Sequence, residues 1–341
     1  MKTVFHVPEL HPFAKYVAIL ARGKTRSRAL TQEEAADAMQ MILSDQARPE
    51  QIGAFLMLLR LREETSEETA GFAQGSRATI DVPENAPDVD VDWSSYAGKR
   101  IQLPWFILSA LALASAGYKV FMHGTDGHTP GRVYTRSTLE TLGVPVSKNL
   151  EDAALHLGQN NFAYAPIEAF CPKLQELIQL RPIFGLRSPV HSFSRMLNPF
   201  SAPVMMQGIF HRGFMDIHAG AAILLNQPHS AVFRGDGGEI ERRPNKPTVV
   251  WETKGQEEPV VSEWPAILSE PHQPADQEMD VGRLVDVWAG DRADEYGEAA
   301  VVGTLAITLK TMQKAATPED AQVLAQQIWN DRNKSRLLTA A

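Results

Sequence analysis

The chain has 341 residues, of which 44% are hydrophobic and 22% are charged, values that are ordinary for a soluble globular protein. Its single cysteine, Cys171, excludes an internal disulfide and suits a reducing compartment. The opening residues include His6, Pro8 and Glu9 instead of an apolar signal core, and no run approaches the roughly 18 apolar residues of a membrane-spanning helix. We therefore expect a cytoplasmic protein.

The net charge of −8 is unevenly distributed along the chain. The first 28 residues hold six lysines and arginines against one glutamate, whereas two later stretches, 93–125 and 177–215, contain no acidic residue. A chain with segregated charge can bind a polyanion on one face even when it is acidic overall. The alternative is that the acid-free stretches are buried core, where charges are rare. The arginines of 177–215 are hard to bury; they are Arg181, Arg187, Arg195 and Arg212.

Residues 1–77 predict a small helical domain with a basic N-terminal arm. Capping boxes at Thr31 and Thr65 are typical of helix starts, because the hydroxyl and a glutamate three residues later satisfy each other's backbone N–H groups. Pro49 favours the first turn of a helix between them. Residues 78–92 contain two prolines and are expected to form a hinge or linker.

Residues 93–341 predict one α/β domain. Short apolar strands alternate with helical segments, which favours a largely parallel central sheet flanked by helices. The expected strands are 119–124, 162–165, 204–209, 231–233 and 248–251. The expected helices are 107–116, 137–142, 174–180, 303–312 and 318–329. The expected fold class is therefore α/β with a small all-helical N-terminal domain.

The helical domain resembles that of a known family. The segments Leu-Thr-Gln-Glu-Glu-Ala at 30–35 and Gln-Ile-Gly-Ala-Phe-Leu-Met at 51–57 resemble the opening helices of anthranilate phosphoribosyltransferases, which have the glycosyltransferase family 3 fold. Further similarities follow in order at His123-Gly124, Gly185-Leu186-Arg187 and Leu197-Asn198-Pro199. The resemblance implies an active cleft at the hinge and a homodimer formed through the helical domain. We also expect a segment near 170–198 to pack back on that domain.

The diphosphate-binding motif of that family is missing from this chain. A glycine-rich turn binds phosphate through unhindered backbone N–H groups. The family has Gly-Thr-Gly-Gly-Asp where this chain has Ser-Ser-Tyr-Ala-Gly at 94–98, so that Tyr96 would occupy the space a diphosphate needs. The family's Asn-x-Ser-Thr, which also faces phosphate, is replaced by Pro-Trp-Phe-Ile at 104–107.

The catalytic and metal-binding residues are also incomplete. The resemblance leaves His123 and Glu239 as candidates for catalysis, and Arg181 matches the arginine that pairs with the substrate carboxylate. The family's paired Asp-Glu for Mg²⁺ is reduced to Glu239, and one carboxylate makes a poor site. We expect no cofactor, with Mg²⁺ only if the chain is an enzyme. His123 and His128 flank Asp126 but lack a further ligand, so no metal site is expected.

The first function that these observations favour is non-sequence-specific binding of nucleic acid, DNA in particular. The chain resembles a divergent branch of the family that lacks the diphosphate motif, and this resemblance implies nucleic-acid binding. Lysines and arginines neutralise phosphates and release counterions, and Tyr96 is the best candidate to stack an unpaired base, since Trp105 and Phe106 are expected in the core. The candidate anion-binding residues, of which the last three are expected on an exposed loop, are Lys24, Arg26, Arg28, Lys99, Arg100, Arg132, Arg136, Arg181, Arg187, Arg195, Arg242, Arg243 and Lys246.

Two alternatives stay open. One is a glycosyl or phosphoribosyl transferase, hence a pentosyltransferase, with an altered substrate that His123, Arg181 and Glu239 would serve. The other is a protein-interaction scaffold that uses the helical face of 51–68. We expect no anthranilate phosphoribosyltransferase activity, and the sequence leaves the choice among single-stranded DNA, duplex DNA and RNA open.

Overall fold

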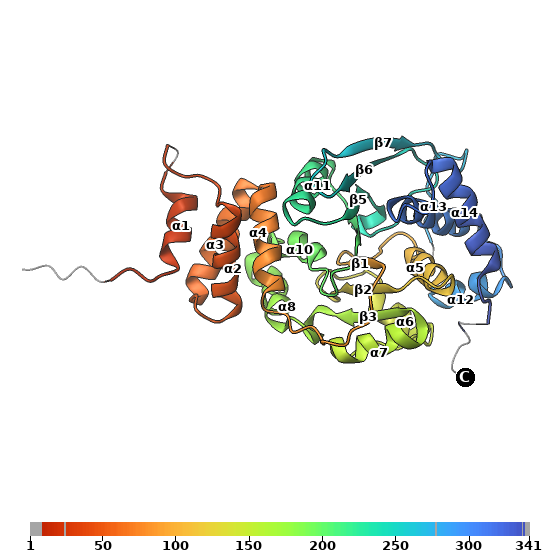
Figure 1. Ribbon diagram of the computed structural model, residues 1–341, viewed down its shortest axis with the longest axis horizontal. Helices are drawn as coiled ribbons and strands as arrows, with labels where there is room; N and C mark the ends of the chain where they lie inside the picture. Colours follow the sequence, from red (N-terminus) through yellow and green to blue (C-terminus); the bar gives the residue numbers. More distant parts are fainter. Residues whose placement is uncertain (1–8, 24, 277, 336, 338–341) are drawn as a thin grey trace, which may run out of the picture.

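The computed structural model describes residues 9–23, 25–276, 278–335 and 337, so Lys24 of the basic arm lies outside the described residues. Four helices form one end of the molecule (Figure 1): α1 Ala14–Ala21, α2 Gln32–Leu43, α3 Pro49–Arg62 and α4 Ser66–Arg77. Both expected capping boxes are confirmed, with Thr31 capping α2 and Thr65 capping α4. Pro49 is the first residue of α3, as its position predicts.

Seven strands form one sheet in the order β3-β2-β1-β4-β5-β6-β7. They are β1 Val91–Ser95, β2 Val120–Gly124, β3 Phe162–Pro166, β4 Val204–Ile209, β5 His229–Arg234, β6 Thr248–Lys254 and β7 Val260–Trp264. The first five are parallel to one another, and β6 and β7 continue the sheet as antiparallel strands. The expected fold class, α/β with a small helical domain and a largely parallel sheet, is confirmed.

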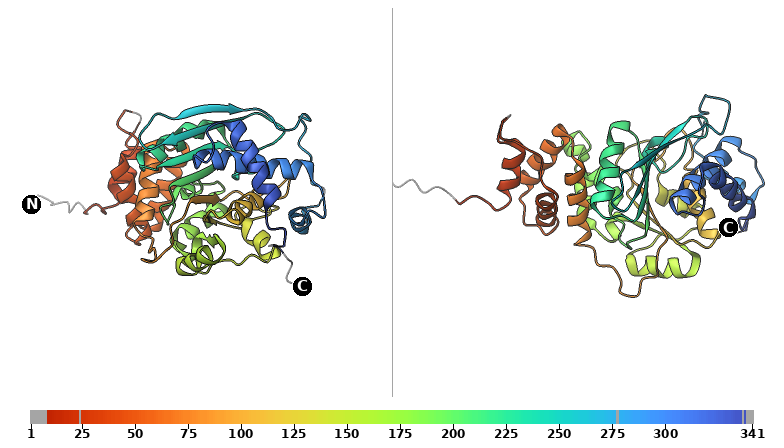
Figure 2. Two further views of the ribbon diagram at one scale, coloured as in Figure 1. Left: turned by 45° about the vertical axis from the view of Figure 1, so that its right-hand side comes forward. Right: turned by 45° about the horizontal axis from the view of Figure 1, so that its top comes forward.

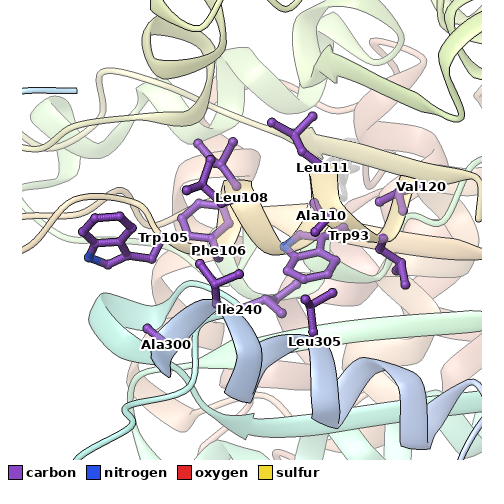
Figure 3. Close-up of a cluster of buried hydrophobic side chains, with 14 of the residues drawn as sticks. Trp93, Trp105, Phe106, Leu108, Ala110, Leu111, Val120, Ile240, Ala300 and Leu305 are labelled. Carbon is purple, nitrogen blue, oxygen red and sulfur yellow. The ribbon is translucent and has the colours of Figure 1, made fainter. Parts of the chain in front are cut away.

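Helices cover both faces of this sheet (Figure 1). The helices that follow α4 are α5 Phe106–Ser115, α6 Thr135–Thr141, α7 Leu150–Asn160, α8 Pro172–Gln179, α9 Arg181–Phe184, α10 Val190–Phe193, α11 Met215–Leu224, α12 Gly282–Ala289, α13 Glu295–Thr311 and α14 Pro318–Asp331. On one face α5, α13 and α14 bury the largest hydrophobic cluster, and Figure 3 shows Trp93 of β1 among side chains of α5 and α13. On the other face α7 covers β2 and β3, and α11 covers β5 and β6. In the described part of the chain no helix has the length and apolar composition needed to cross a bilayer.

The sequence pattern does not predict β1, β7, α7, α11 or α12. Strand β1 is missed because Asp92 and Ser94 interrupt its apolar character, although all five of its residues are buried. Strand β7 is missed because it lies at the edge of the sheet and most of its side chains are exposed. Helix α13 begins at Glu295 instead of 303, since Asp294 accepts a hydrogen bond from the Gly297 N–H at 2.8 Å and caps it.

The helical domain is fixed to the rest of the chain by the segment that contains α8 and α10. Phe72 of α4 packs against Phe193 of α10 with ring centroids 5.4 Å apart. The Arg77 guanidinium donates to the carbonyl oxygens of Met196 and Leu197 at 2.8 and 2.9 Å. The two turned views of Figure 2 show α1–α4 at one end and the C-terminal helices at the other. The segment from α8 to Leu197 therefore lies between the helical domain and the sheet.

We expect substitutions at two glycines to separate close helix packing from helix propensity. A Cβ at Gly71 of α4 would collide with the carbonyl oxygen of Gln32 in α2. Gly71→Ala should therefore lower the free energy of unfolding by about 1–3 kcal/mol through overpacking. Gly53→Ala in α3 is the control, because its Cβ would meet only Phe184 at 3.7 Å, and the change should stabilise by up to about 1 kcal/mol. Urea unfolding measures both, and equal effects would contradict the packing described for α2 and α4.

Candidate anion-binding cleft

The candidate site lies where the carboxyl ends of the parallel strands meet the helical domain. In parallel α/β sheets the loops at this edge are the usual position of ligand sites. The loop after β1, residues 96–99, meets the loop after β5, residues 235–241, and the segment that follows β4. Arg60 and Glu64 reach the same place from the end of α3.

The Glu239 carboxylate occupies the backbone donors of the loop after β1. Its Oε1 accepts hydrogen bonds from the N–H groups of Ala97 at 2.7 Å and Gly98 at 2.6 Å. Only 1% of Glu239 is exposed, and burial raises its pKa while nearby Arg195 opposes that rise. The Glu239 backbone lies so close to Gly208 and Gly235 that both positions require glycine, since a Cβ at either would collide with the Glu239 carbonyl oxygen. The chain thus supplies its own anion to the loop that corresponds to the missing diphosphate motif.

Tyr96 is part of this filled loop and is not a stacking platform. It is 1% exposed, and its hydroxyl hydrogen-bonds His123 Nδ1 at 2.8 Å. The prediction that Tyr96 stacks an unpaired base is therefore wrong, because the loop turns its ring into the core. Trp105 and Phe106 are also buried, as expected for core residues. His123 is itself fully buried, with Nε2 3.3 Å from Asp92, so this catalytic candidate does not reach the surface.

A buried group of charges further fills the cleft floor. The Lys99 ammonium, which is 1% exposed, forms ion pairs with Asp236 and Glu241. Burial raises the pKa of Glu241 to about 7 against the opposing effect of Lys99. Asp236 also accepts from Arg243 Nε at 2.9 Å. The prediction that Lys99 binds external phosphate is wrong, because its charge is neutralised internally.

These carboxylates do not fit the Mg²⁺ that the family implies. Asp236 and Glu241 are tied to Lys99, and Glu239 is tied to the Ala97 and Gly98 amides. Both oxygen atoms of Asp236 and of Glu241 are therefore engaged within the chain, whereas Glu239 keeps only its buried Oε2 without a hydrogen-bond partner among the described residues, and one such oxygen makes a poor Mg²⁺ site. Across the residues that the structure describes, no group of three His, Cys, Asp or Glu side chains is arranged to hold a metal ion.

Two further candidate cations are engaged elsewhere. Arg136 forms ion pairs with Asp126, at 2.7 Å, and with Glu168. Arg242 is 2% exposed, donates to the Pro265 carbonyl oxygen and lies 5.2 Å from the Trp264 ring centroid. The prediction that Arg242 is exposed on a basic loop is therefore wrong, because its side chain packs against Trp264 and Pro265. The remaining predicted residues of the loop and arm are placed as follows: Arg243 is half-buried and paired with Asp236, Arg28 is paired with Glu34 at 2.6 Å, and Arg26, Arg100 and Lys246 are exposed.

The structure brings four predicted arginines together at the cleft: Arg132, Arg181, Arg187 and Arg195. Arg181 and Arg187 both donate to Thr129 Oγ1, at 2.6 and 3.0 Å. Arg132 and Arg195 donate to main-chain carbonyl oxygens. Burial, together with the other three arginines, lowers the pKa of Arg187 to about 10. Among the described residues, none of the four forms an ion pair with a carboxylate.

A cavity of about 150 Å³ opens beside Arg187 and Arg195. The Ser188 Oγ and His191 Nε2 at this cavity are buried and have no hydrogen-bond partner within the described chain. Burial first, and then the nearby charges, lower the pKa of His191 to about 3, so its ring is neutral at physiological pH. The lining residues that sequence reasoning misses are Arg60, Glu64, Ser188, His191 and His211. Three of them lie in the acid-free stretch 177–215, whereas no sequence signal places Arg60 and Glu64 here.

Known proteins resemble this chain over most of its length. A model described as the glycosyl transferase family helical bundle domain matches residues 16–79. Anthranilate phosphoribosyltransferase of Caldivirga maquilingensis is 30% identical over 232 residues, which cover 67% of this chain and 68% of that protein. Uncharacterized protein YbiB of Escherichia coli is 25% identical over 247 residues, covering 69% and 74%.

The solved structures give the same fold. Anthranilate phosphoribosyltransferase from Saccharomyces cerevisiae, in complex with PRPP and Mg, superposes with a TM-score of 0.77 at 18% identity and covers 95% of both chains. The enzyme from Thermus thermophilus gives 0.75 at 19% identity and covers 94% of both chains. The two-part architecture defines a glycosyltransferase family 3 fold. The chain belongs to the anthranilate phosphoribosyltransferase family.

We expect Glu239→Ala to expose the loop donors that Glu239 now fills. Losing hydrogen bonds to a buried charge costs about 2–3 kcal/mol, so the midpoint of thermal unfolding should fall. Sulfate should then raise the midpoint more in the variant than in the wild type, because an anion can take the place of the carboxylate. Glu258→Ala, at an exposed position, is the control. Equal sulfate responses in all three proteins would show that these amides do not form an anion site.

Proposed function

We propose that this protein binds nucleic acid without sequence specificity, through phosphate contacts in the cleft between its two domains. One observation carries the proposal: Arg132, Arg181, Arg187 and Arg195 gather there, and none of them forms an ion pair with a carboxylate of the described residues, although Arg195 lies near Glu239. Burying like charges together is costly unless a counter-charge is supplied. A phosphate group supplies that charge, and the planar guanidinium binds its oxygen atoms in a bidentate way.

An extended anion fits better than a small one because the basic surface continues beyond the first cavity. The segment 209–211 lines the cavity beside Arg187, and Arg212 then lines a second cavity together with Arg234, Arg243 and Lys246. Cations that follow one another along a groove track a phosphate backbone. Each phosphate neutralised releases counterions, which gives affinity without base recognition.

A transferase with an altered substrate is the second candidate, and membership of the family favours it. The proteins from Caldivirga, yeast and Thermus are named for phosphoribosyl transfer. Neither these three names nor that of YbiB mentions nucleic acid. The site opposes this candidate, since Glu239 and Tyr96 fill the loop where a diphosphate would bind and His123 is buried. A homodimer through the helical domain stays a prediction.

We expect the double variant Arg60→Gln and Arg187→Gln to weaken binding of a labelled single-stranded oligonucleotide. Both side chains line the first cavity, and neither is in an ion pair with a carboxylate of the described chain. Loss of two phosphate contacts should make the slope of log affinity against log salt shallower by about 1.4, since each contact on a single strand contributes about 0.7. Fluorescence anisotropy at several salt concentrations measures the slope.

The matched control for that pair is Arg292→Gln. Arg292 is exposed and lies between α12 and α13, at the far end from the helical domain. Its replacement removes one positive charge, half of what the pair removes, but should leave the slope unchanged. A slope that becomes shallower in Arg292→Gln by about half as much as in the pair would mean that the net charge of the protein, rather than the cleft, determines binding.

The transferase candidate has its own test. We expect isothermal titration with phosphoribosyl pyrophosphate and Mg²⁺ to show no saturable binding, because Glu239 occupies the loop donors. We also expect no rescue of a strain that lacks anthranilate phosphoribosyltransferase. Saturable Mg²⁺-dependent binding would replace the nucleic-acid proposal with the transferase.

A further inference from the structure

A second cavity, of about 280 Å³, opens at the carboxyl end of β5 and against β6. Its lining combines cationic and apolar side chains and includes no carboxylate. The cations are Arg212, Arg234, Arg243 and Lys246, and the apolar walls come from Met215, Pro247, Val249 and Trp251. Neither the resemblance to the transferases nor the first cavity accounts for this combination.

The cations of this cavity are only partly neutralised. Arg243 pairs with Asp236 beneath it, whereas Arg212, Arg234 and Lys246 form no ion pair within the described part of the chain. Burial, followed by the charges of Arg243 and Arg212, lowers the pKa of Arg234. The buried Nε of Arg234 has no hydrogen-bond partner in the structure as described. The positive charges of Arg212, Arg234 and Lys246 are therefore available to bind a negatively charged ligand.

Trp251 is the aromatic wall of the cavity and differs from the other tryptophans. The remaining five are at most 1% exposed; they are Trp93, Trp105, Trp264, Trp288 and Trp329. Trp251 is only half-buried: it packs against the small apolar cluster that includes Met215 and Val232 and also borders the cavity. A packed, partly open indole beside uncompensated arginines is a common platform for a nucleic-acid base, because any base can stack on it.

We propose that this cavity holds one unpaired nucleotide of a single strand, with its base against Trp251 and its phosphate between Arg212, Arg234 and Lys246. The inference rests on the proposed function and extends it to a preference for single strands. In a duplex each base is already stacked and paired, so it reaches Trp251 only after unstacking, at a cost in affinity. The first cavity would hold a neighbouring phosphate of the same strand.

The test measures tryptophan emission and the anisotropy of a labelled twelve-nucleotide oligothymidylate in the same titration. Because Trp251 is the half-buried tryptophan, the strand should quench emission in the wild type and leave emission unchanged in Trp251→Phe. Trp251→Leu should weaken binding at least about fivefold, the lower end for one base stacked on an aromatic ring. Trp251→Phe, which keeps a ring against Met215 and Val232, should lose less affinity, so that a folding defect in the leucine variant does not decide the result.

Three further ligands show whether the quenching of Trp251 comes from a base of a single strand or from the phosphate groups alone. A duplex of equal length and base-free polyphosphate should compete for the cations without quenching Trp251, and thymidine monophosphate should quench only at much higher concentration. Anisotropy that rises without Trp251-dependent quenching, equal quenching by the duplex, or quenching by the mononucleotide but not by the strand would overturn this inference and leave the proposed function in place. No anisotropy change with any strand at low salt would overturn both.

Discussion

The pair of hydrogen bonds from Ala97 and Gly98 to the Glu239 carboxylate determines what the cleft can bind. In this fold the loop after β1 presents backbone N–H groups at the carboxyl edge of the sheet, where an anion is favoured. Here the anion belongs to the chain itself and is held at 2.7 and 2.6 Å. Gly208 and Gly235 allow the backbone of Glu239 to lie close to them. The backbone therefore fixes the position from which the Glu239 side chain reaches the loop.

The internal ion pairs divide the basic residues of the chain into two groups. Lys99 and Arg136 form ion pairs with carboxylates of the protein. Arg181 and Arg187 meet at Thr129 without such a match. Because a charge is costly to bury alone, we propose that the second group marks the surface where a ligand supplies the opposite charge. The family's fold is kept, while Glu239 occupies the backbone donors of the loop after β1.

The sequence predicts the features that depend on neighbours in the chain and misses those that depend on distant ones. The capping boxes of Thr31 and Thr65 involve residues three positions apart, so their pattern is sufficient. The partners of Lys99 lie 137 and 142 residues away, and nothing local distinguishes it from Arg187. Tyr96 is misjudged for the same reason, because only the packing of its loop against β2 shows that the ring is buried. Arg60 reaches the site from the helical domain, and no sequence pattern around it indicates this position.

We propose that Glu239 closes the loop after β1 and that the arginines without an ion-pair partner bind phosphate instead. A crystal structure of the protein with a short oligothymidylate tests it most directly. We expect a phosphate within hydrogen-bonding distance of the Arg187 guanidinium, with the Glu239 carboxylate still on the amides of Ala97 and Gly98. A phosphate on those amides with Glu239 displaced, or a strand bound elsewhere with the arginine cluster empty, would contradict it.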